Sequence, residues 1–188
     1  ERDAKGSPTG WLRELAANIA RDATPAPDDD QMAALLEDAA AELHRLGITG
    51  ICDQRIKDQQ DGPHLFSLLR RLEVQGRWKM RTNLNVAAHH LAQARDLGLT
   101  TGFGSDRLRL GHLKVFADGT LGSLTARMLE PFQSGATGED GRGLYLTPPQ
   151  EMRETFRQAA QAGFSLSVHA IGDEANRVCL DLFQELDK

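Results

Sequence analysis

Cysteine is scarce in this sequence: only two occur among 188 residues. Cys52 and Cys179 each lie inside an apolar run, which favours buried free thiols over a disulfide framework. Reduced thiols are typical of the cytoplasm, so we expect a cytoplasmic location.

Long hydrophobic runs and blocks of like charge are also lacking. No apolar stretch approaches the roughly 20 residues that a membrane span needs, so we expect no membrane partner. The 22 lysines and arginines and the 27 aspartates and glutamates are scattered and give a net charge of −5. Because no basic stripe could follow a phosphate backbone, we expect no nucleic-acid partner. The sequence also lacks an initiator methionine and stops directly after a periodic helix, which favours a segment of a longer protein.

Helical and extended segments alternate along the chain. Apolar residues at helical spacing predict helices at 31–46, 63–75, 91–97, 148–161 and about 174–186. Their predicted caps are an aspartate among 28–30, Thr147 with Pro148 as first helical residue, and Asp173. Short apolar runs predict buried strands at 48–52, 80–86, 113–117 and 164–170.

This alternation predicts an α/β protein with parallel strands and helical crossovers. A doubly wound sheet and a (β/α) barrel both fit residues 28–188. Residues 1–27 fit neither pattern, and we interpret them as an N-terminal extension.

Several chemically active side chains lie in or just after the predicted strands: Lys114, Asp118, His169, Asp173 and Asp53. In parallel α/β structures the ligand site lies at the carboxyl ends of the strands, where these side chains would converge. A lysine within an apolar run needs a particular explanation, because burying a lone ammonium costs several kcal/mol. The glycine-rich loop at 133–143 is expected near the same site.

Each of these residues also has an ordinary structural explanation. Asp173 is well placed as a helix cap, and Asp118 with Gly119 is a common turn pair. His169 could be a hydrogen-bonded core histidine, and Lys114 could reach the strand end and pair with Asp118. Alternation along the strand places Lys114 with Phe116 on one face, which would be the barrel interior if the other face packs on helices.

Two longer motifs go beyond composition and spacing. The runs LKVFADGTLGS at 113–123 and VHAIGDEAN at 168–176 resemble amidohydrolase family 3, the branch that includes N-substituted formamide deformylase. Weaker matches, LGITG at 46–50 and LEPF at 129–132, occur in the order that the family has.

The resemblance implies a metal-dependent hydrolase on a (β/α)8 TIM barrel, of which this chain supplies strands 2 to 5. Lys114 then matches the fourth-strand metal ligand, a lysine carboxylated by carbon dioxide, and His169 matches the fifth-strand histidine. Carboxylation would explain the buried lysine, because it turns an ammonium into an oxygen anion. Asp118, Asp53 and Asp173 are expected around the metal ligands or on the substrate side. The implied metal is zinc and the implied substrate is a small molecule cleaved at an amide or cyclic amide carbon–nitrogen bond.

The sequence departs from the family pattern in its missing ligands. It has no His-x-His pair before Lys114, no motif for a sixth-strand histidine, and no eighth-strand aspartate. We therefore expect this chain alone to bind metal weakly and to be inactive. An open partial barrel exposes strand edges, so we also expect self-association. Two alternatives remain open: a barrel lyase or aldolase that forms a Schiff base at Lys114, and a non-catalytic half-barrel.

Overall fold

Four parallel strands form a single curled sheet. The computed structural model describes residues 3, 5–10, 12, 19–20, 23–25, 27–56, 63–133, 138 and 140–186. The strands lie in the order β1-β2-β3-β4. Their bounds are β1 Gly50–Ile56, β2 Arg81–Ala87, β3 Leu108–Phe116 and β4 Leu166–His169. Chain order equals sheet order, which is the arrangement of a (β/α) barrel segment and confirms the predicted partial TIM barrel.

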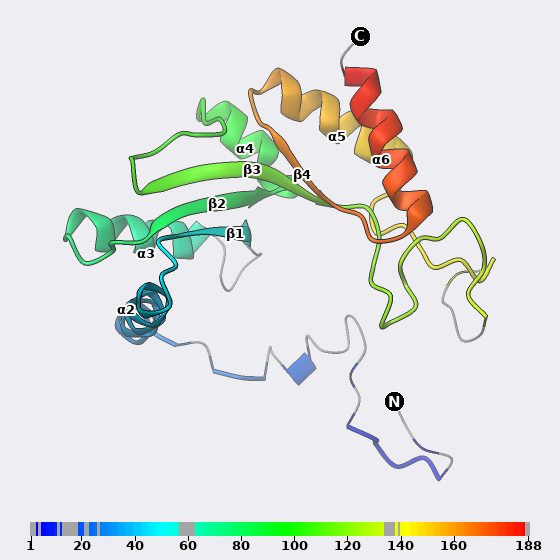
Figure 1. Ribbon diagram of the computed structural model, residues 1–188, viewed down its shortest axis with the longest axis horizontal. Coiled ribbons are helices and arrows are strands. Elements are labelled where there is room, and N and C mark those ends of the chain that lie inside the picture. The colour runs from blue at the N-terminus through cyan, green and yellow to red at the C-terminus, as the bar shows by residue number, and fades with distance from the viewer. Residues whose placement is uncertain are drawn as a thin grey trace.

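Helices cover one face of this sheet; α2 precedes β1, and α3, α4, α5 and α6 follow β1, β2, β3 and β4 in turn (Figure 1). The helices are α2 Asp29–Arg45, α3 Pro63–Val74, α4 Leu91–Asp96, α5 Pro149–Gln161 and α6 Asp173–Leu186. A short 3₁₀ turn, Ala88–His90, directly precedes α4 in the sequence. The long loop between β3 and α5 projects from the carboxyl ends of the strands (Figure 1). No helix in the described ranges is long and apolar enough to cross a membrane.

The start and end of α2 show how local sequence sets these elements. The Asp28 carboxylate accepts a hydrogen bond from the Gln31 backbone N–H, and the Gln31 side chain accepts one from the Asp28 N–H. This reciprocal pair is a capping box. Gly47 ends the helix with a φ of +81°, which glycine adopts without strain. The predicted cap and stop are both confirmed.

Three apolar clusters lie between the helices and the sheet. The first packs α2 and α3 on β1 and β2, around Leu68, Leu72 and Leu84. The second joins β2 and β3 to α4 and α5, and the third joins β3 and β4 to α5 and α6. Burial of these side chains from water stabilises the layer and fixes which sheet face is the outer one.

Two strands are longer than predicted. The first does not end at Cys52 but runs through Asp53 to Ile56, and the third begins at Leu108 instead of Leu113. Register shifts interrupt both strands, one between Asp53 and Ile56 and one on β3 between Leu110 and Leu113. Such irregularities break the alternation of apolar and polar side chains, so the pattern gave boundaries that were wrong.

Smaller predictions are also corrected. Cys52 is exposed, because it lies on the open inner face; Cys179 is buried as predicted. Helix α5 begins at Pro149 with Pro148 as its N-cap, and Thr147 provides no side-chain cap. A proline at the first helical position is favourable because it lacks the N–H that would stay unpaired there. Much of 1–27 lies outside the described residues, so its role as an extension stays a prediction.

Candidate functional site

Lys114 and His169 lie on the same inner face of the sheet. Phe116 is in register with His169, and Lys114 is in register with Ser167. Residues in register on neighbouring parallel strands point to the same side, and alternate residues of one strand share a face. The opposite face of β3 carries Leu113 and Val115 into the helix-packed clusters. The predicted orientation of Lys114 is therefore confirmed.

The ring of Phe116 contacts both side chains. The Lys114 Nζ lies 5.0 Å from the Phe116 ring centroid. The centroids of the Phe116 and His169 rings are 5.3 Å apart. Lys114 is only 8% exposed, so the ring face takes over part of the solvation that its ammonium would find in water.

Asp118 is fully buried just beyond the end of β3. Its Oδ2 accepts hydrogen bonds from the backbone N–H groups of Arg127 and Gly172, each at 2.8 Å. Its Oδ1 accepts a third from the Ile171 N–H at 2.9 Å. These bonds compensate for the loss of water around a buried carboxylate. Asp118 thereby joins the loop after β3 to the loop after β4 at the carboxyl end of the sheet.

The imidazole of His169 has a defined partner. Its Nε2 lies 2.9 Å from the Gly119 carbonyl oxygen and 3.9 Å from Asp118 Oδ1. A carbonyl oxygen can only accept, so this contact requires the proton on Nε2, and a singly protonated ring then keeps its lone pair on Nδ1. His169 is 25% exposed at its side chain and thus accessible to a ligand.

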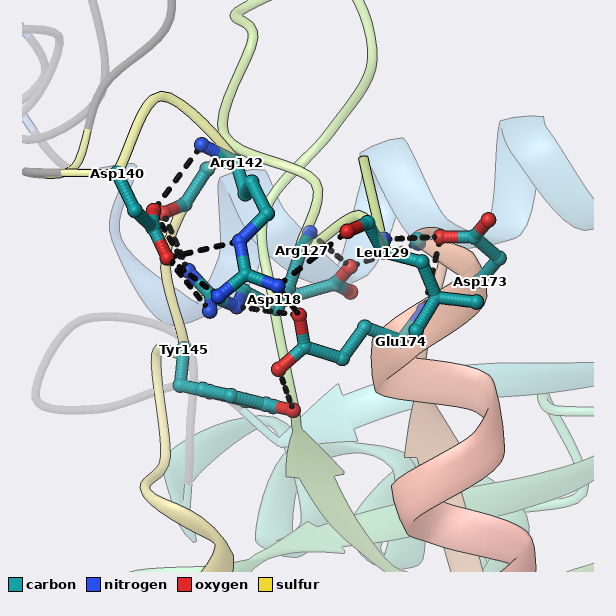
Figure 2. A network of polar contacts seen from close by, with 10 residues as sticks. Asp118, Arg127, Leu129, Asp140, Arg142, Tyr145, Asp173 and Glu174 are labelled. Atoms are coloured by element: carbon teal, nitrogen blue, oxygen red, sulfur yellow. Dashed lines mark hydrogen bonds and ion pairs between the residues drawn. The ribbon is translucent and has the colours of Figure 1, made fainter. Parts of the chain in front are cut away.

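A network of charged groups closes the loop after β3 onto α6 (Figure 2). Arg127 pairs with Asp140 at 2.9 Å and with Glu174 at 3.0 Å. The Arg127 Nε and Glu174 Oε2 atoms are not aligned as a hydrogen bond, so this second contact is an ion pair. Arg142 adds a contact to each carboxylate, at 2.9 Å and 3.5 Å. The expected proximity of the 133–143 loop to the site holds for its described residues 140–143.

This network changes the pKa values of its members. The hydrogen bond from Arg127, with those from Arg142, lowers the pKa of Asp140 far below its usual range. The Tyr145 hydroxyl donates to Glu174 at 3.1 Å, and the Arg127 guanidinium lies 5.4 Å from the Tyr145 ring centroid. Burial, and then the Glu174 carboxylate, raises the pKa of Tyr145 to about 12.

The remaining two aspartates lie apart from Lys114. Asp173 is the first residue of α6 instead of the residue before it, and its carboxylate accepts from Leu129 N–H at 2.7 Å and Glu174 N–H at 2.9 Å. Asp53 lies within β1 in register with Leu84, a residue of the helix-packed core. The structure thus brings Asp118 next to His169 and does not bring Asp53 there. Their substrate-side roles stay predictions.

The residues of this site fit a metal ion only in part. Among the described residues there is no group of three or more His, Cys, Asp or Glu side chains that could hold one. His169 fits a ligand through Nδ1, because Nε2 is already bonded. Lys114 fits one only as a carbamate, since an ammonium has no lone pair. The described residues therefore offer two donors that fit a metal, which is fewer than a complete ligand set.

Some residues of this site gave no signal in the sequence. Gly119 acts through its backbone carbonyl, which no side-chain pattern can reveal. Arg127 and Glu174 are ordinary charged residues 47 positions apart that meet only through the fold. Phe116, in contrast, was predictable from its alternation with Lys114.

Proteins of the amidohydrolase family resemble this chain in sequence. The sequence model of the amidohydrolase family matches residues 1–188. The exoenzymes regulatory protein AepA of Pectobacterium carotovorum is 32% identical over 97% of this chain and 38% of its own length. The N-substituted formamide deformylase of Arthrobacter pascens is 25% identical over 98% of this chain and 34% of its own length. The chain thus spans little more than a third of these relatives.

A solved structure agrees with the fold. An uncharacterized metal-dependent hydrolase from Pyrococcus furiosus superimposes with a TM-score of 0.72 at 28% identity. The match covers 92% of this chain and 34% of that one. With the family model matching every residue, and with the sheet order of a barrel segment, the chain belongs to the amidohydrolase family.

Proposed function

We propose that this chain is part of the catalytic domain of a metal-dependent hydrolase that cleaves a non-peptide carbon–nitrogen bond in a small amide or cyclic amide. The observation that carries the proposal is the placement of Lys114 and His169 on one inner face at the carboxyl ends of β3 and β4. The similarity to a formamide deformylase supports the bond type. Membership of the amidohydrolase family favours this function over a Schiff-base lyase.

In this proposal Lys114, carboxylated, would supply oxygen and His169 would supply Nδ1 to a divalent metal, with zinc suited to such a mixed donor set. Such a metal would supply Lewis-acid chemistry to the site, activating water and polarising the scissile carbonyl. The Gly119 carbonyl oxygen, 2.9 Å from His169 Nε2, would leave Nδ1 as the nitrogen that faces the metal. Phe116 fills the space beside both ligands and keeps water away from the Lys114 stem.

The other metal ligands would come from parts of the enzyme outside this chain, which spans 34% of the deformylase. We therefore propose that the isolated chain binds zinc weakly and does not turn over substrate. Its open strand edges would favour self-association, which light scattering at increasing concentration would measure. A constant monomer mass would contradict this part. We also propose that the enzyme is located in the cytoplasm, where both cysteines stay as free thiols.

The test uses the longer enzyme that carries this segment. Zinc content and hydrolysis of an N-substituted formamide are measured for the wild type, Lys114→Ala and His169→Ala. Both variants are expected to lose metal and to lower kcat/KM more than about a hundredfold, since each removes a ligand. His64→Ala on the surface of α3 is the matched control, because it removes an exposed histidine. Full metal content and activity in both ligand variants would overturn the proposal.

A further inference from the structure

The turn Asp118–Gly119 holds His169 from several sides. The Gly119 carbonyl accepts the ring Nε2–H, although 50 residues separate the two in sequence. The backbone is held as well, because the Ala117 N–H donates to the His169 carbonyl at 2.8 Å. We propose that Asp118 and Gly119 are positioning residues that fix the orientation and the protonated nitrogen of the His169 ring.

Asp118 acts on the chain that leaves β4. Its two carboxylate oxygens accept from the N–H groups of Ile171 and Gly172, at 2.9 Å and 2.8 Å. These are the second and third residues after His169, so the bonds fix the backbone direction at the histidine. The carboxylate has no exposed surface, and water cannot replace these contacts. Loss of Asp118 would release the backbone on which the imidazole depends.

Thr125 braces the carbonyl of Gly119. The Gly119 N–H donates to the Thr125 carbonyl at 3.2 Å, and the Thr120 N–H donates to Thr125 Oγ1 at 2.9 Å. A Cβ atom at Gly119 would lie only 2.0 Å from this Oγ1, so the approach requires glycine. Thr125 is itself only 3% exposed. The hydroxyl therefore sets where the carbonyl points.

This arrangement explains how one ring nitrogen is kept available. With Nε2 engaged as a donor, rotation of the imidazole would break its hydrogen bond to the Gly119 carbonyl. Nδ1 is then the nitrogen that remains for a ligand. The inference deepens the proposed function and rests on it for its catalytic meaning. The hydrogen bond itself, however, forms in the metal-free chain.

The experiment observes this proton directly. Nitrogen-15 histidine is incorporated into the metal-free chain, and ring N–H signals are recorded in water by NMR. His169→Gln identifies the signal of His169 among the six histidines. We expect a slowly exchanging proton on Nε2. A His169 ring that is protonated on Nδ1, or that shows no protected N–H, would overturn the proposal.

Variants then separate positioning from general stability. Asp118→Asn should speed exchange of the His169 ring proton by about tenfold or more, because one local closing contact is lost. Thr125→Val, which keeps the shape and removes the hydroxyl, should act in the same direction, and Thr125→Ser should restore protection. Asp140→Asn is the matched control, because it loosens the same loop without touching Asp118. Unchanged exchange in Asp118→Asn or Thr125→Val, or equal acceleration in Asp140→Asn, would overturn the inference.

The Thr125 pair keeps the test decisive if Asp118→Asn does not fold. Valine keeps the shape of Thr125 without its hydroxyl, and serine keeps the hydroxyl that the Thr120 N–H uses without the methyl group. Both variants are compared as folded proteins, so that a difference in ring-proton exchange reports the hydroxyl. A different result would show that the proposed function is wrong. In that case zinc would not bind at His169 in the longer enzyme, while its ring proton would stay protected in this chain.

Discussion

The ammonium of Lys114 lies 5.0 Å from the centroid of the Phe116 ring on the inner face of β3. This contact bears on the problem posed by a lysine that is 8% exposed. A cation over an aromatic face is stabilised by the ring quadrupole, more so where water is excluded. The ring thus stabilises Lys114 in its charged form, whereas a carbamate would be an anion and would lose this attraction.

A double-mutant cycle tests this relationship. Lys114→Met removes the charge, Phe116→Leu removes the ring, and urea unfolding gives the free energy of each variant and of the pair. We expect a coupling energy of about 1 kcal/mol, the typical value for a partly desolvated cation over a ring. Additive effects would mean that Lys114 is not held as a cation by Phe116.

Tyr145 permits a direct pKa measurement, because it is the single tyrosine of the sequence. Tyrosinate absorbance during an alkaline titration should give a pKa of about 12, raised by burial and by Glu174. Glu174→Gln should move this pKa down, since it removes the negative charge beside the hydroxyl. The raised pKa also means that stability is intact below about pH 10 and falls as the pH rises through 12. A midpoint near the ordinary value of 10 would contradict the buried Tyr145–Glu174 contact.

Asp140 gives the opposite pH dependence. Arg127 lowers its pKa below the ordinary value of 3.8, so its contribution to stability is present above that pH. It is lost as the pH falls through the lowered pKa of the folded state. Urea midpoints of the wild type and Asp140→Asn should therefore differ at neutral pH and approach each other as the solution is acidified below 3.8. A gap of constant size would show that the charge of Asp140 is not what stabilises the loop.

The backbone of β3 passes close to the Asn85 side chain at Gly111. A Cβ atom there would lie 2.3 Å from Asn85 Oδ1, the atom that accepts from the His112 N–H. Gly111→Ala should lower the free energy of unfolding by about 1–3 kcal/mol, because the buried Asn85 must move. Gly122→Ala is the control, since its Cβ would meet no atom within 4 Å. Equal stability of both variants would contradict the packing of Asn85 over the glycine.

The sequence alone predicted where the helices lie and which residues of β3 point toward them. Helix α2 has its capping box at Asp28 and Gln31 and its stop at Gly47, each close to the helix end that it sets. Leu113 and Val115 alternate with Lys114 and pack against the helices, so Lys114 points to the inner face. These features are local, and local sequence records them. Lys114 and His169 also lie in continuous motifs, and their role as metal ligands stays a prediction.

Features that depend on distant contacts could not be predicted. Asp53 was expected at the end of a strand, yet β1 continues to Ile56 with a register shift in its pairing with β2. Cys52 was expected to be buried, but an apolar run does not reveal that this partial barrel leaves one sheet face open. The bond between His169 and Gly119 joins the end of β4 to the loop after β3 through a backbone atom. Such contacts follow from the sheet order and leave no trace in residue type.

The most direct test of the central claim is a zinc-edge anomalous difference map of the longer enzyme that carries this segment. The account predicts a peak within bonding distance of His169 Nδ1 and of a carboxyl group on Lys114 Nζ, at roughly 2 Å from each. A zinc peak coordinated by other residues, with Lys114 unmodified and His169 Nδ1 away from the metal, would contradict it.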